Sequence, residues 1–269
     1  MNDLNLITAP IRRELTGFKN RLNRSVNGLS GSFTGPIRAV RYFFGNPGKF
    51  LRPILVLLSA GAVRGRNRGA GQKKKILVLA SAVEFIHAAS LLHDDILDGS
   101  LLRRGRPAVN RKFGTKAAVL AGDLLYINAL KECTRLLPQE VVDTLLACVE
   151  GMCGAEVDRI SRRGLKYFDL VRSKTARLMS ACCGCAAIVA AAGPPVVRGF
   201  FRFGLDFGMA YQFMDDSIDG DGPLSPGMLR IEAEKSMKNA FRALSGVPES
   251  PCKRALKDFG KFILALRAN

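Results

Sequence analysis

The chain of 269 residues contains no tryptophan, and only 7% of its residues are aromatic. It has two histidines, and among its seven cysteines only Cys182 and Cys185 have the Cys-x-x-Cys spacing, so the second pair of ligands that a structural zinc site needs is missing. The N-terminus has no basic segment followed by an apolar one, which argues against a signal peptide. These absences predict a reduced, cytoplasmic protein with buried thiols.

Acidic residues are also scarce, with 23 Asp and Glu against 41 Lys and Arg, so the formal net charge is +18. This excess predicts an anionic partner and leaves nucleic acid, a lipid surface and a phosphorylated substrate as alternatives. The 48% hydrophobic content excludes a disordered chain and allows a large core. Residues 178–197 lack charge over the length of a membrane span, but their richness in Ala, Gly, Ser and Cys favours a buried helix.

Apolar residues recur every three or four positions through most of the chain, which predicts helices, and strand-like alternation is nearly absent. The stretches are 53–63, 76–97, 116–137, 140–160, 168–192, 197–218, 228–244 and 251–266. Gly and Pro mark the breaks between them, and no linker divides the chain. We therefore expect one all-α domain over residues 1–269, built as a bundle of antiparallel helices.

Two acidic clusters stand out in this acid-poor sequence, Asp94–Asp98 and Asp215–Asp219, both of the form Asp-Asp-x-x-Asp. On a helix, the first and last carboxylates of each cluster share one face, because they are four residues apart. Such crowding is unfavourable unless a cation lies between them, and Mg²⁺ commonly binds one or two carboxylates plus substrate phosphates. One cluster alone is typical of a solvated helix face, but two copies favour a metal site.

Basic residues accompany the first acidic cluster. Glu84, His87, Asp94 and Asp98 fall on one helical stripe, which makes His87 a candidate phosphate donor. The planar guanidinium groups of arginine match phosphate oxygens. Further candidates to bind phosphate are Lys49, Arg52, Arg103, Arg104 and Lys174. Metal-binding acids together with phosphate-binding bases indicate a diphosphate site.

With these motifs the chain resembles the trans-type isoprenyl diphosphate synthases, or polyprenyl synthetases. The matching segments occur in family order from about residue 10 to the C-terminus, and they are 48–53 (Gly-Lys-Phe-Leu-Arg-Pro), 84–87, 92–98, 102–105, 121–123, 174–176 and 211–219. The resemblance implies an all-α bundle around a deep central cavity, and a homodimer. It also implies that an allylic prenyl diphosphate is elongated with isopentenyl diphosphate, with the aid of about three Mg²⁺ ions.

The resemblance also implies a role for each matching residue. The metal ligands would be Asp94, Asp98 and Asp215, with Asp219 acting through water. Arg103 and Lys174 would bind the allylic diphosphate and act with the metal ligands in catalysis. Isopentenyl diphosphate would be bound by Lys49, Arg52, His87 and Arg104, and Gln212 would line the site.

Two features concern the product and the turnover. Ala89 and Ser90, just before the first acidic cluster, are small where short-chain synthases carry bulky residues, which favours a medium or long product. After Asp219 the family's lysine-bearing lid loop is missing, and the first later lysine is Lys235. Without that loop we expect weaker exclusion of water and slower turnover.

Other functions remain as alternatives. A terpene cyclase shares the ionisation chemistry but does not need cations for a second diphosphate. A non-catalytic partner subunit of a synthase fits the missing lid but not the two intact acidic clusters. Nucleic-acid binding is disfavoured, because zinc-finger spacing and aromatic ribonucleoprotein motifs are absent. The surplus charge at Arg64, Arg66, Arg68, Lys73, Lys74, Lys75, Arg162 and Arg163 predicts transient contact with an anionic membrane.

Overall fold

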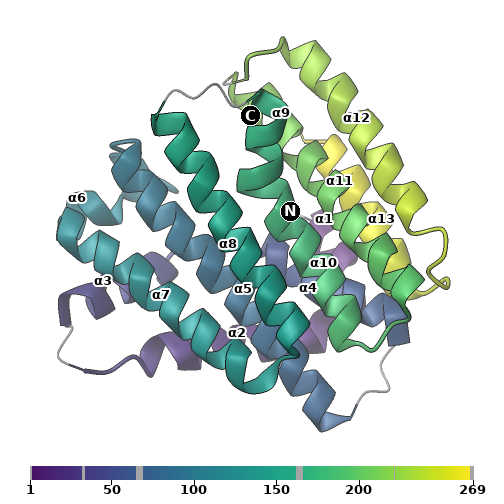
Figure 1. Cartoon of the computed structure of the whole chain (residues 1–269), viewed down its shortest axis with the longest axis horizontal. Helices are drawn as coiled ribbons and strands as arrows, with labels where there is room; N and C mark the ends of the chain where they lie inside the picture. Colours follow the sequence, from purple (N-terminus) through teal and green to yellow (C-terminus); the bar gives the residue numbers. More distant parts are fainter. Residues whose placement is uncertain (1, 32–33, 65–68, 162–165, 221, 267–269) are drawn as a thin grey trace.

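The protein is a bundle of α-helices, as the sequence predicts (Figure 1). The structure is a computed structural model that describes residues 2–31, 34–64, 69–161, 166–220 and 222–266. Arg66, Arg68, Arg162 and Arg163, four of the surplus basic residues, lie outside the described residues.

The helices follow one another through short connections. In chain order the elements are α1 (Asn2–Thr8), the turn η1 (Ala9–Ile11), α2 (Arg12–Asn27), α3 (Thr34–Phe44), α4 (Leu51–Arg64), α5 (Ala70–Leu97), β1 (Leu102–Arg103), β2 (Arg106–Pro107), α6 (Val109–Phe113), α7 (Thr115–Leu136), α8 (Gln139–Ile160), α9 (Tyr167–Val171), the π-helical turn η2 (Arg172–Ala176), α10 (Arg177–Val189), α11 (Pro194–Asp219), α12 (Pro226–Ala243) and α13 (Pro251–Leu264).

Local sequence signals explain where the last helices begin. Proline stands at the start of α11, α12 and α13, where its missing N–H leaves no helical bond unmade. The hydroxyls of Ser225 and Ser250 accept hydrogen bonds from the backbone N–H groups of Met228 and Lys253, at 3.3 and 3.1 Å. These caps place the helix starts within three residues of the predicted stretches.

The core is formed around α5, which packs against α4, α7 and α10, while α11 packs between α10 and α12. In Figure 1, α7 and α8 cross the front of the bundle. Helix α5 is long and apolar enough to cross a membrane, but 72% of its most apolar window is buried among the other helices. Residues 178–189 of the uncharged segment predicted as a buried helix lie in α10, whose cysteines are buried, and residues 194–197 begin α11.

The structure corrects three expectations. Residues 2–44 carry no helix in the sequence prediction, yet they form α1, α2 and α3, whose polar stretches are stabilised by packing on the bundle. The continuous helix expected over 168–192 is divided by η2 and ends at Val189. Cys153 is exposed on α8, unlike the buried thiols that we expected.

Candidate active site

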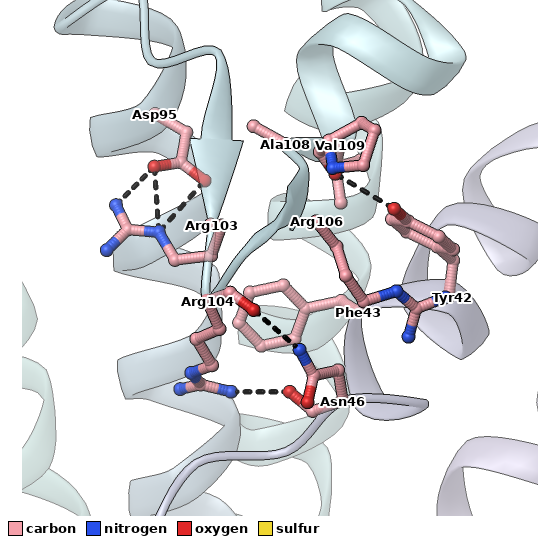
Figure 2. Close-up of a pocket in the computed structure, with 10 residues that line it drawn as sticks. Tyr42, Phe43, Asn46, Asp95, Arg103, Arg104, Arg106, Ala108 and Val109 are labelled. Carbon is pink, nitrogen blue, oxygen red and sulfur yellow. Dashed lines mark hydrogen bonds and ion pairs between the residues drawn. The ribbon is translucent and has the colours of Figure 1, made fainter.

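The middle aspartate of the first acidic cluster, Asp95, is buried and paired with an arginine. Asp95 is only 1% exposed, and its carboxylate accepts hydrogen bonds from the Arg103 guanidinium, with Nε 3.0 Å from Oδ1. The contact is shown in Figure 2. A buried carboxylate needs such a partner, because an unpaired charge away from water is strongly unfavourable. Arg103 therefore contacts the protein, although the sequence suggested a phosphate group as its partner.

The outer aspartates of this cluster contact cations from two other elements. Lys174 Nζ lies 3.8 Å from Asp94 Oδ1, and Arg159 Nη2 lies 2.7 Å from Asp98 Oδ1. Glu156 joins the two cations, since its Oε2 is 2.6 Å from Lys174 Nζ and its Oε1 accepts a hydrogen bond from Arg159 Nε at 2.6 Å. Burial alone would raise the pKa of Glu156, but the hydrogen bonds from the two cations lower it.

The second acidic cluster lies at the end of α11, and its middle aspartate is also held by hydrogen bonds to neighbouring side chains. Asp216 accepts hydrogen bonds from the Tyr167 hydroxyl and from Gln212 Nε2, the latter at 2.8 Å. Asp215 and Asp219 are exposed, and within the described residues neither forms an ion pair. In both clusters the middle aspartate is thus held by neighbouring side chains, and in the second cluster the outer carboxylates have no ion pair within the described residues.

The π-helical turn η2 connects the two clusters. Lys174 contacts Asp94 on α5, and the next residue, Thr175, donates a hydrogen bond of 2.8 Å to Gln212 Oε1 on α11. A π-turn of this kind inserts a residue into a helix and is frequent at functional sites. Here it allows consecutive side chains to reach different helices, so both acidic clusters border one site.

The hairpin β1–β2 separates the two consecutive arginines. Arg104 and Gly105 have φ of 53° and 73°, the left-handed conformation that a tight two-residue hairpin turn requires. Figure 2 shows the result: Arg103 turns to Asp95, whereas Arg104 reaches Asn46. Arg104 Nη1 donates to the Asn46 carbonyl at 2.9 Å, and Asn46 Nδ2 donates to the Arg104 carbonyl at 3.1 Å.

The four predicted ligands of isopentenyl diphosphate are brought together in one cavity of about 470 Å³. These residues are Lys49, Arg52, His87 and Arg104, and they are joined by Glu84 and Tyr211. Gly48 lets Arg104 approach the wall, because a Cβ at this position would lie 2.7 Å from Arg104 Nη2. Gln212, which we expected to line the site, is one residue from Tyr211 but is bonded to Thr175 and Asp216 instead.

Burial and charge set the protonation of this cavity. Burial, followed by the nearby Arg52 and Arg104, lowers the pKa of His87 well below its usual value, so the imidazole is neutral at pH 7 and donates one N–H. Burial raises the pKa of Glu84 to about 7, although Arg52 and Arg104 oppose the shift. Partial desolvation by the surrounding residues, followed by the like charges of Asp219 and Asp216, raises the pKa of Asp215 to about 6.

The Glu84 carboxyl makes stability depend on pH. Because its folded pKa is raised, the folded state binds more protons, so the stability this group contributes is complete below about pH 4.5 and is lost as pH rises to about 7. We expect Glu84→Gln to gain about 2 kcal/mol over the wild type between pH 5 and pH 8, measured by urea unfolding. The exposed Glu150→Gln is the control, and parallel pH profiles for wild type and Glu84→Gln would contradict the prediction.

Divalent cations fit the outer aspartates on chemical grounds. Asp215 and Asp219 offer carboxylate oxygens four residues apart, and their like charges repel each other unless a cation lies between them. Within the described part of the chain, no group of three or more acidic, cysteine or histidine side chains is already arranged as a complete metal site. The remaining ligands would have to come from water or from substrate, as is common for Mg²⁺.

Sequence reasoning missed several residues that hold this site together. Glu156 and Arg159 on α8 contact the predicted site residues Lys174 and Asp98, and Tyr167 on α9 contacts Asp216. The spacing of Glu156 and Arg159 places them on one face of the predicted helix 140–160, but nothing in the sequence indicates which face meets α5.

The fold and the site define a helical protein with two paired acidic clusters beside a cationic cavity suited to phosphate groups. The model of the polyprenyl synthetase family matches residues 37–223, and the chain belongs to this family. It is 32% identical over 216 residues to heptaprenyl diphosphate synthase component 2 of Geobacillus stearothermophilus, covering 78% of this chain and 64% of that one. It is 34% identical over 184 residues to octaprenyl diphosphate synthase of Escherichia coli, covering 66% and 55%. The chain thus spans less than two thirds of these relatives' length.

Solved structures share the fold. A polyprenyl synthase of Caulobacter crescentus, complexed with calcium and isoprenyl diphosphate, superposes with a TM-score of 0.85 at 22% identity and covers 98% of both chains. Geranylgeranyl pyrophosphate synthetase of Pyrococcus horikoshii superposes with a TM-score of 0.87 at 21% identity, covering 99% of this chain and 100% of that one. The all-α fold expected from the sequence is therefore confirmed.

Proposed function

We propose that this chain is a trans-prenyltransferase that condenses isopentenyl diphosphate with an allylic prenyl diphosphate and depends on Mg²⁺. The observation that supports the proposal is the presence of two cationic sites, both of which border residues of α5. One is the cavity with Lys49, Arg52 and Arg104, and the other is Lys174 beside the outer aspartates. Two such sites suit two diphosphates, whereas a terpene cyclase needs only one.

The chain's own residues would bind, orient and shield the substrates. Lys174 would bind the allylic diphosphate, and Lys49, Arg52, neutral His87 and Arg104 would hold isopentenyl diphosphate with its double bond toward the allylic carbon. About three Mg²⁺ ions bound at Asp94, Asp98, Asp215 and Asp219 would stabilise the charge of the departing diphosphate. Apolar walls would exclude water, and the released diphosphate would accept the proton lost after the new carbon–carbon bond forms.

The deciding experiment supplies purified protein with Mg²⁺, labelled isopentenyl diphosphate, and geranyl or farnesyl diphosphate, and separates the products by length. We expect elongated prenyl diphosphates. A cyclised hydrocarbon formed without consumption of isopentenyl diphosphate would instead identify a terpene cyclase.

The second candidate is a partner subunit with little activity of its own. A relative is named as component 2 of a heptaprenyl diphosphate synthase, and the connection between α11 and α12 spans only residues 220–225, with no room for a lysine-bearing lid. Failure of every allylic primer to support elongation would favour this candidate. If the chain is active alone, the short connection predicts slower turnover than in relatives with a full lid, because water is excluded less well.

We also propose a medium or long product. Ala89 is buried, and Ser90, the small residue beside it, is partly exposed just before the first acidic cluster. Replacing Ser90 with phenylalanine would place a bulky side chain just before the first acidic cluster, so we expect products shorter by one or more isoprene units at similar total turnover. Chromatography of the reaction products measures the change, and an unchanged product length would show that another residue sets the limit.

A homodimer is the assembly that we propose. The α7 and α8 helices pack together and expose large apolar side chains, which are Val119, Leu120, Ile127, Leu146, Val157 and Ile160. A second copy of the chain would bury this face. We expect Leu120→Asp with Ile127→Asp to convert the dimer to monomer in sedimentation measurements. The equally exposed Ile231→Asp on α12 should leave the mass unchanged, and a wild-type monomer would refute the proposal.

Transient contact with an anionic membrane is a further part of the proposal. Lys73 lines a groove of about 630 Å³ with Arg12 and Arg13, and Lys74 and Lys75 are exposed beside it. Each basic residue near an anionic surface contributes about 1 kcal/mol at low salt. We expect binding to vesicles that contain phosphatidylserine and release by salt, with the protein in the cytoplasmic fraction at high salt. Equal binding to neutral vesicles would contradict this.

A further inference from the structure

The two acidic clusters differ in charge. In the first, three carboxylates (Asp94, Asp98 and Glu156) share two cations, Lys174 and Arg159. In the second, Asp215 and Asp219 form no ion pair within the described residues, and Asp216 receives its hydrogen bonds from the neutral groups of Tyr167 and Gln212. Ion pairs within the protein therefore offset much of the charge of the first cluster. The second cluster has no such pair among the described residues, and the cations that act on Asp215, Lys49 and Arg52, do so without direct contact.

Arg159 is the residue that causes this difference at Asp98. Its Nη2 lies 2.7 Å from Asp98 Oδ1, and its Nε lies 2.6 Å from Glu156 Oε1. Glu156 is one helical turn before Arg159 on α8 and largely buried, so it holds the guanidinium in place. The Glu156–Arg159 pair belongs to a network of charges, because Lys174 Nζ lies 2.6 Å from the other oxygen of Glu156.

We propose that Arg159 is a built-in counterion that occupies the Asp98 end of the first acidic cluster, so that the substrate-free protein binds a divalent cation at Asp215 and Asp219 first. The guanidinium occupies Oδ1 of Asp98 and offsets its charge, so a cation binds there more weakly until Arg159 moves away. The negative charge of a bound diphosphate favours that move by offering Arg159 another partner. Arg159 is thus a positioning residue that makes metal binding at the first cluster depend on substrate. The inference rests on the proposed function for the identity of the cation.

The test is a titration of the substrate-free protein with Mn²⁺, followed by electron paramagnetic resonance and by thermal unfolding. In Arg159→Gln we expect one additional site or an affinity raised roughly tenfold at the first cluster, and a larger stabilisation by Mn²⁺ than in the wild type. The gain should disappear in Arg159→Gln with Asp98→Asn. The control Arg202→Gln removes the ion pair of 3.0 Å to Asp206 on α11 and should titrate as the wild type does.

A second pair of variants keeps the inference testable if Arg159→Gln does not fold. In an otherwise wild-type chain, Asp98→Asn should leave Mn²⁺ binding unchanged, whereas Asp215→Asn should weaken it at least tenfold. Equal Mn²⁺ binding by wild type and Arg159→Gln, or loss of binding in Asp98→Asn, would overturn the inference. Because no turnover is measured, these outcomes are independent of whether the chain elongates prenyl diphosphates.

Discussion

Asp215→Asn is expected to lower kcat for prenyl elongation by roughly 10²- to 10³-fold, and Asp94→Asn by a similar factor. Each substitution keeps the size of the side chain and removes one negative charge from an outer position that faces the site. The loss falls on the transition state, where charge develops on the departing diphosphate, so kcat should change more than KM. Steady-state assays with labelled isopentenyl diphosphate measure both constants.

Asp206→Asn is the matched control for Asp215→Asn. Asp206 is also on α11, and it forms an ion pair with Arg202 well before the acidic cluster. Its replacement should leave kcat within about twofold of the wild type, because the Arg202–Asp206 ion pair contacts neither acidic cluster nor the cationic cavity. If Asp215→Asn retained half of the wild-type kcat, the assignment of Asp215 as a metal ligand would be wrong.

Gly204→Ala is expected to destabilise the fold by about 3 kcal/mol, because α10 and α11 approach closely at this position. A Cβ on Gly204 would collide with the backbone carbonyl of Met179 and would lie 2.7 Å from Cα of Ser180. Backbone atoms of a packed helix cannot rotate away as a flexible side chain can. The helices must therefore move apart, and we expect a fall in Tm of several degrees in calorimetry.

Gly154→Ala is the control for this steric argument. Gly154 lies inside α8, and a Cβ added to it would have no neighbouring atom within 4 Å. Alanine should therefore raise stability by about 0.5–1 kcal/mol through its better helix propensity. Equal Tm values for Gly204→Ala and the wild type would show that α10 and α11 can move apart without loss of stability. A movement of α10 would also shift η2 and Lys174, so Gly204→Ala should lose activity as well.

The helical class and the acidic clusters could be predicted because both depend on short-range spacing. Apolar residues every three or four positions indicated eight helical stretches, and Asp94 and Asp98 share a helix face in any helix. The first three helices were missed because their polar sequences become helical by packing on the bundle. The division of the helix at η2 was missed because a π-turn has no periodic signature.

The sequence by itself determined the residues that carry charge and their spacing along each helix, because helical geometry follows from the local chain. Only the tertiary structure decided which partner each charge received. In the tertiary structure Arg103 donates a hydrogen bond to Asp95, whereas Arg104 lines the cavity, although the two arginines are adjacent in the chain. The tertiary structure also brought Glu156 and Arg159 from α8 to the end of α5. Burial on the assembled bundle, which depends on contacts distant in sequence, then raised the pKa of Glu84.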